Sequence, residues 1–230
     1  MRKVIAVIGF AGVFAVAGTA MAQFSSGSSE AGFTVGGAIP LTKTDLTSLG
    51  GKNETAVKSG VDFGGRYLYH TTPEWAFGGE VSYSAFGDKT HDLGGLAEIK
   101  ESAGALDVQG IAKYTFAADK KTRPYLVGGI GYGNLKQKTQ TKPIGGATWV
   151  DTGTTESRTN FDENLGGLAL SIGAGFEHFL TDTLLLGIEG RWKYLGTKDT
   201  VNDPVLGAAW DIKSSSSLLL TAGLNWKFGK

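Results

Sequence analysis

Leu170–Leu195 reads "LSIGAGFEHFLTDTLLLGIEGRWKYL", and this stretch decides the fold. Apolar residues occupy every second position in two segments, 165–180 and 183–196, which the short turn "LTDT" joins. This alternation predicts two strands with one apolar face each, and the short connection predicts that they pair antiparallel. Both segments exceed the usual strand length of about five or six residues and reach the roughly 9–11 residues of a tilted membrane strand.

The same period of two recurs in six further segments. These segments span residues 31–39, 58–70, 75–87, 103–117, 123–135 and 216–229. Tight turns ("TTPE", "AADKKTR" and "LTDT") alternate with long polar connections at 40–57, 88–102, 136–164 and 197–215. Alternating short and long connections are typical of an up-and-down barrel with its variable loops at one end. The sequence therefore predicts an all-β fold, an eight-stranded antiparallel transmembrane β-barrel.

The two faces of these segments differ in bulk and charge. One face is apolar and aromatic and carries no charge, whereas the other is rich in Gly, Ser and Ala. A lipocalin-type barrel also has eight strands, but its apolar face points inward. The interior of an eight-stranded barrel is too narrow for some dozen aromatic side chains, whereas lipid accepts them and penalises charge. We therefore expect the apolar face to meet lipid, with aromatic residues gathered at both membrane interfaces.

The polar face then forms a charged interior network. Besides Lys227, it carries Asp62, Arg66, Glu80, Asp107, Lys113, Glu177, Glu189, Arg191 and Lys193. Five acidic and five basic groups in a narrow interior of low dielectric constant favour mutual ion pairs that close the barrel. The alternative is a gated narrow channel for small solutes, lined by the same residues.

The N-terminus has the pattern of a cleavable signal peptide. Arg2 and Lys3 precede an apolar run that ends at Ala20-Met21-Ala22, a cleavage pattern of small residues. We expect residues 1–22 to be removed and residues 23–230 to form the barrel domain. The alternative is a membrane-anchor helix. The apolar run is short for such a helix, and it is rich in Gly and Ala.

With its eight segments, "RPYLVGGIGYG" and the terminal "TAGLNWKFGK", the sequence resembles the small OmpA/OmpX-type barrels of the bacterial outer membrane. The resemblance implies an exported outer-membrane protein with both termini in the periplasm. It also implies that the barrel assembly machinery reads the last strand through Thr221, Gly223, Trp226 and Phe228. Gly229 and Lys230 depart from this pattern, because the aromatic is often the final residue. OmpA-type members often add a peptidoglycan-binding domain, and we expect this chain to lack that tether.

The sequence offers little for catalysis. It has no Cys and three His, of which only His91 lies toward the long loops, beside Asp88 and Asp92. An Asp–His spacing in a polar loop is more often solvated surface than a catalytic pair or a metal site. We expect no enzyme activity and no cofactor or metal; the alternative is a lipid A-modifying barrel enzyme centred on His91. The net charge of zero gives no reason to expect nucleic acid as a partner.

The long loops carry the remaining candidates for binding. Trp149 and Trp210 are candidate contacts for a host or surface ligand, or they pack against neighbouring loops. Lys136, Lys138 and Lys142 are candidates for contact with lipopolysaccharide phosphates. The sequence thus favours a structural or adhesive outer-membrane protein whose partners are outer-membrane lipid, lipopolysaccharide and the assembly machinery.

Overall fold

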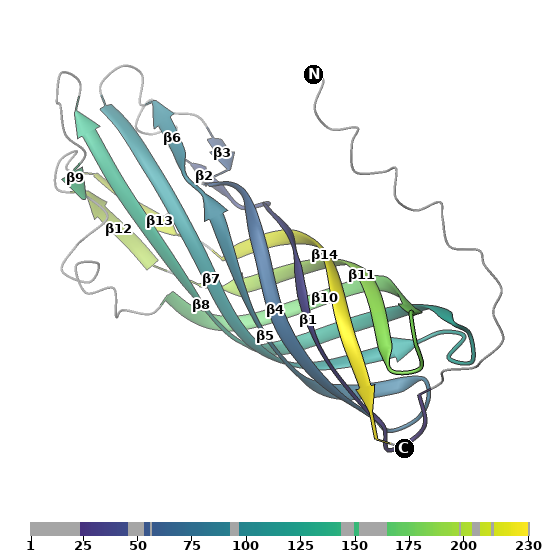
Figure 1. The fold of residues 1–230 in the computed structure, drawn as a ribbon. Coiled ribbons are helices and arrows are strands. Elements are labelled where there is room, and N and C mark those ends of the chain that lie inside the picture. The colour runs from purple at the N-terminus through teal and green to yellow at the C-terminus, as the bar shows by residue number, and fades with distance from the viewer. Residues whose placement is uncertain are drawn as a thin grey trace.

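The computed structural model describes residues 24–45, 53–55, 57–92, 97–143, 150–151, 165–197, 199–203, 208–212 and 214–229. Within them, eight long antiparallel strands form the wall of a barrel (Figure 1). They are β1 (Ser29–Pro40), β4 (Lys58–His70), β5 (Trp75–Gly87), β7 (Ala97–Thr115), β8 (Thr122–Pro143), β10 (Leu165–Phe179), β11 (Leu184–Gly196) and β14 (Ser215–Phe228). The predicted fold class is confirmed.

Each wall strand pairs with its neighbour in sequence, and the last strand closes the barrel against the first. Ser29 pairs with Phe228 and Pro40 with Ser217, so β1 and β14 are in register over the whole of β1. The start of β1, the end of β14 and the three short turns therefore lie at one end, the short-turn end (Figure 1). The long connections leave the opposite end, the long-loop end. Closure satisfies the backbone groups of every wall strand, as a lipid environment demands.

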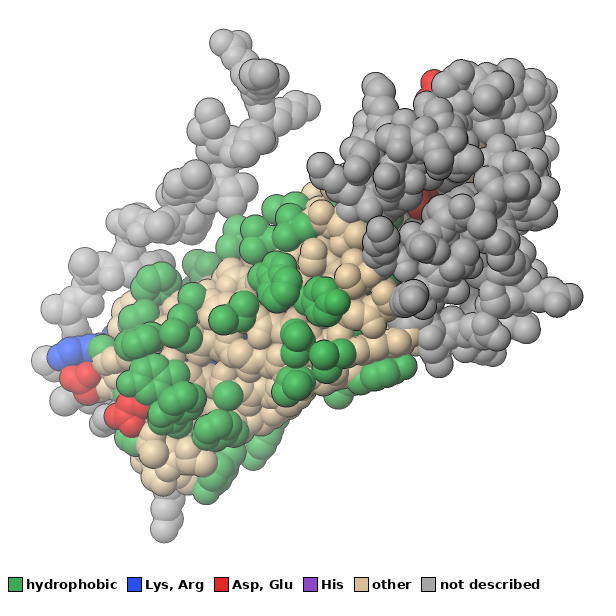
Figure 2. Space-filling model, turned by 180° about the vertical axis from the view of Figure 1, so that it is seen from behind, with side chains coloured by type: hydrophobic (Ala, Val, Ile, Leu, Met, Phe, Trp, Pro, Cys, Tyr) green, Lys and Arg blue, Asp and Glu red, His purple; other side chains and the backbone are tan. Residues whose placement is uncertain are grey.

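Side chains alternate strictly between the outside and the inside of the wall. The bulky apolar set is exposed on the outside, where hydrophobic side chains cover the barrel between its ends (Figure 2). Aromatic neighbours gather near the short-turn end, where the ring centroids of Trp75 and Tyr114 are 4.9 Å apart and those of Tyr67 and Phe228 are 6.1 Å apart. Trp192 and Tyr194 form another pair toward the long-loop end, at 6.0 Å. The described part of the chain has no helix long and apolar enough to cross a membrane.

Two predicted strand boundaries were wrong. The segments predicted at 103–117 and 123–135 extend into predicted loops, since β7 begins at Ala97 and β8 continues to Pro143. Beyond the membrane the outer face no longer meets lipid, so apolar alternation ends while the Thr-rich β8 sequence still favours extended backbone. Short strands accompany this extension: β2 (Lys43–Asp45), β3 (Asn53–Thr55), β6 (Lys89–Asp92), β9 (Val150–Asp151), β12 (Asp199–Asp203) and β13 (Ala208–Ile212). The predicted signal peptide, residues 1–22, lies outside the described residues.

Candidate functional site

The middle of the interior is a layer of two arginines and two glutamates. Arg66 lies 3.3 Å from Glu80 and 2.9 Å from Glu189, and Arg191 contacts the same two carboxylates, at 2.7 Å from Glu189. All four side chains are buried, and the Tyr125 hydroxyl donates to Glu189 at 2.9 Å. The cross-strand register of Arg66 opposite Glu80 sets this pairing. The layer spans the lumen and is electrically neutral.

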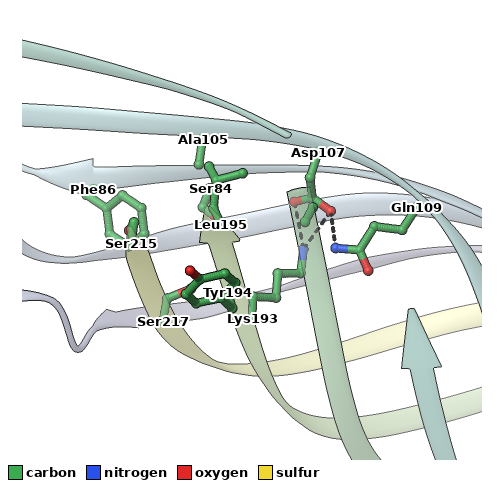
Figure 3. A pocket seen from close by; sticks show the side chains of 11 residues that line it. Ser84, Phe86, Ala105, Asp107, Gln109, Lys193, Tyr194, Leu195, Ser215 and Ser217 are labelled. Carbon is green, nitrogen blue, oxygen red and sulfur yellow. Dashed lines mark hydrogen bonds and ion pairs between the residues drawn. The ribbon is translucent and has the colours of Figure 1, made fainter. Parts of the chain in front are cut away.

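Above this layer, toward the long-loop end, lies a second buried cluster (Figure 3). Lys193 contacts Asp107 at 3.1 Å and Ser82, and Asp62 lies 3.9 Å away. Gln109 donates a hydrogen bond to Asp107 at 2.9 Å, so this carboxylate accepts hydrogen bonds from several donors. A cavity of about 30 Å³ adjoins the cluster, which is room for about two water molecules.

A third cluster fills the short-turn end. Glu30 contacts Lys113 at 2.9 Å and His70 at 3.4 Å. Glu177 contacts both Lys113 and Arg123. The structure therefore places all nine sequence-predicted interior residues inside the barrel, distributed over these three groups.

The interior residues that sequence reasoning missed include Glu30, His70, Arg123 and Tyr125. Glu30 and Arg123 lie just outside or at the edge of the predicted strands, and His70 and Tyr125 went unassigned. The alternation of the strands contains a signal for three of them. Arg123 and Tyr125 share the inward phase of β8 with Val127, and Glu30 shares the inward phase of β1 with Gly32.

Apolar side chains also point inward near both ends. Phe24, Phe179 and Leu185 form one buried cluster at the short-turn end. A second cluster, of Leu135, Ala169 and Leu195, lies toward the long-loop end. These inward apolar side chains were not predicted on the face that is rich in Gly, Ser and Ala. These apolar groups add to the packing of the lumen.

His91 is not solvated surface, contrary to the sequence-based expectation. It lies in β6, pairs with Ile99 of β7 in register, and is 5% exposed. Its Nε2 lies 3.1 Å from Glu101, which is also buried. Asp88 instead contacts Lys100 at 2.9 Å, and no group of three acidic or histidine side chains suited to a metal occurs among the described residues.

The three candidate lysines lie on the outer face of the extended wall. Lys136, Lys138 and Lys142 share the phase of β8 that exposes Tyr132, and their partners across β7 are Gly104, Ser102 and Glu98. They therefore continue the lipid-facing phase above the last exposed aromatic residue of β8.

The remaining candidates divide between the wall and the loops. Of the predicted assembly residues, Trp226 and Phe228 are exposed on the outer face of β14, whereas Thr221 is buried inside. Gly223 pairs with Thr34 of β1. Trp210 lies in β13 opposite Val201, and Trp149 lies outside the described residues.

A closed eight-stranded barrel with an apolar outer wall and a polar, charged interior defines the class of small outer-membrane β-barrels. The sequence matches the family "outer membrane protein beta-barrel domain" over residues 9–228, and the chain belongs to this family. It is a protein of the bacterial outer membrane, and the resemblance to OmpA/OmpX-type barrels is confirmed.

The solved structures that share this fold include those of OprG and NspA. OprG from Pseudomonas aeruginosa is 15% identical with a TM-score of 0.52, covering 92% of this chain and 100% of its own. Neisserial surface protein A (NspA) is 14% identical with a TM-score of 0.51, covering 90% of this chain and 100% of its own. Among curated proteins, none matches the chain.

Proposed function

We propose that this protein is a closed, non-catalytic outer-membrane anchor with a structural or adhesive role, which it performs through its four long connections. The observation that carries the proposal is the neutral layer of Arg66, Glu80, Glu189 and Arg191, which fills the middle of the lumen. A channel requires a continuous wet path, and these four buried side chains lie across that path.

The extended wall supports the surface-loop role. A tilted strand needs roughly 9–11 residues to cross the bilayer, whereas β7 has 19 residues and β8 has 22. The surplus lies at the long-loop end, where β6 pairs with β7. Such a wall carries the connections away from the membrane surface, where a large ligand has access to them.

The positions of the three outward-facing lysines of β8 favour lipopolysaccharide as a partner. Lys136, Lys138 and Lys142 lie above exposed Tyr132 on the lipid side of β8. Aromatic residues mark the membrane interface, so the next outward residues meet lipid headgroups, and ammonium groups there attract phosphates.

Planar-bilayer recording tests the closed interior. We expect no steady openings from the purified protein. Steady openings that disappear on replacing Glu80 or Arg191 would overturn the closed anchor in favour of a channel. Mass analysis of lipid A from cells with and without the protein tests the non-catalytic role, for which an unchanged profile is expected.

Two binding measurements test the partners. The triple variant Lys136→Gln, Lys138→Gln, Lys142→Gln should bind lipopolysaccharide more weakly than the parent, whereas Lys120→Gln, at an exposed turn of the opposite end, should not. Equal binding by both variants would contradict the lysine contact. Intact cells displaying the protein should bind host-matrix proteins better than cells without it, and equal binding would remove the adhesive role.

A further inference from the structure

The chain before β1 turns back into the barrel at its short-turn end. The Gly27 N–H donates to the His70 carbonyl at 2.9 Å, and the His70 N–H donates to the Ser28 carbonyl at 2.9 Å. Ser26 Oγ adds a bond to the Thr71 carbonyl at 2.9 Å. Gly27 makes the reversal with a φ of 89°, which residues with a Cβ rarely adopt. We call residues 24–28 the N-terminal hook.

The hook delivers one aromatic side chain into the barrel. Phe24 is 1% exposed, and its ring stacks on His70 with a centroid separation of 3.7 Å. Phe179 lies on another side at 5.7 Å, and Leu185 completes the apolar contact. In the described part of the chain, Phe24 is the only Phe outside the strands that is buried in this way. Phe24 is also the second residue of the mature chain that the cleavage pattern predicts.

Arg123 explains why the receiving site needs an aromatic occupant. Its guanidinium is fully buried, with its centre 4.7 Å from the Phe24 ring and 4.5 Å from the Phe179 ring. One terminal nitrogen contacts Glu177, whereas Nε and the other nitrogen have no hydrogen-bond partner. A buried guanidinium in this state is stabilised by the faces of aromatic rings, which an aliphatic side chain does not supply.

We propose that His70, Arg123, Phe179 and Leu185 form a binding socket for the phenylalanine of the chain's own N-terminal segment, and that its docking closes the short-turn mouth of the barrel. Lys227, whose ammonium lies 5.7 Å from the Phe24 ring, is at the rim of this socket. Because the hook is held by hydrogen bonds and ring contacts, it is a plug that undocks without opening the barrel wall.

Cysteine labelling tests the socket directly, because the chain has no native Cys. Ala76 is fully buried, opposite His70 on β5, so a single Ala76→Cys replacement reports access from this mouth. We expect Phe24→Ala to speed labelling by a water-soluble maleimide at least about tenfold, because undocking exposes the interior locally. The matched control is Phe116→Ala, an exposed phenylalanine at the same end, which should leave the rate unchanged.

A second variant keeps the test decisive should Phe24→Ala fail to fold. Gly27→Val strains the reversal and should undock an intact Phe24, so it should also speed labelling. Slow labelling in a folded undocking variant, with strand content unchanged by circular dichroism, would overturn the socket. The socket proposal rests on the closed anchor but concerns only the short-turn mouth, because the middle charge layer stays intact in these variants. Fast labelling of an undocking variant that shows no conductance supports both proposals. Conductance of the parent protein would contradict the closed anchor and leave the socket standing.

Discussion

Glu189 in the middle layer gives the sharpest stability prediction. Its carboxylate lies 2.9 Å from Arg66 and 2.7 Å from Arg191, and it accepts the Tyr125 hydroxyl at 2.9 Å. The Glu189→Gln replacement keeps the shape of this side chain and removes its charge. Glu80 would then be the one carboxylate left in this layer to balance two guanidinium groups.

The expected loss follows from burial and distance. At an effective dielectric constant of about 20, each ion pair near 3 Å contributes roughly 5 kcal/mol of Coulomb attraction. Desolvation of the three ions offsets much of this attraction, and removing one partner of a buried pair costs about 3–5 kcal/mol. We therefore expect the folding equilibrium constant to fall by roughly 10² to 5 × 10³.

Urea unfolding of the protein in lipid vesicles, followed by tryptophan fluorescence, measures this loss. The control is Asp119→Asn, which removes a carboxylate from an exposed turn and should leave the midpoint unchanged. The double variant Glu189→Gln, Arg191→Gln leaves Arg66 and Glu80 as a neutral pair and should recover part of the stability. Equal midpoints for Glu189→Gln and Asp119→Asn would refute the reasoning, because water would then screen the middle layer.

Three further predictions concern the wall. Ile172, 64% exposed on β10, should tolerate Val, whereas Ile172→Arg should lower the free energy of unfolding in vesicles by about 2–4 kcal/mol. A Cβ on Gly36 would lie 2.0 Å from the Leu220 carbonyl oxygen, whereas one on Gly37 would meet nothing within 4 Å. Gly36→Ala should therefore slow refolding or lower stability at the seam, and Gly37→Ala should do neither. Phe228→Ala should reduce the amount of barrel in the outer membrane while purified protein still refolds; unchanged membrane levels would contradict its role as an assembly signal.

The wall was predictable because lipid and the lumen demand opposite side chains. Along β11, outward Ile188 and Trp192 alternate with inward Glu189 and Arg191, and this contrast is visible in the sequence itself. The pairing of Arg66 with Glu80 also followed from strand order and position. A period of two with matched turns sets the register, and the bulk and charge of the two faces decide which of them meets lipid.

The ends of the extended wall were not marked by apolar alternation, because that contrast disappears outside the membrane. Only the Thr-rich sequence after residue 135 indicated that β8 continues upward as part of a hairpin. On β8, the outward-facing residues are Leu126 and Ile130 within the lipid, but Lys136 and Lys138 above it. A strand whose outer face is polar has the composition of a polar loop, so its end is not marked by hydrophobicity. The burial of His91 depends on the same extension, since it lies in β6 against β7.

Gly27 and Gly229 show a further limit of sequence reasoning, because only barrel closure brings these two segments together. Gly229 has a φ of 86°, which residues with a Cβ rarely adopt, and a Cβ there would lie 3.4 Å from the Gly27 carbonyl oxygen, in ordinary contact with the N-terminal hook. Neither glycine has a periodic pattern around it, and they are 202 positions apart in the sequence. Barrel closure between β1 and β14 brings them together. The positive φ of Gly229 gives a backbone reason for glycine after Phe228 that an assembly signal alone does not provide.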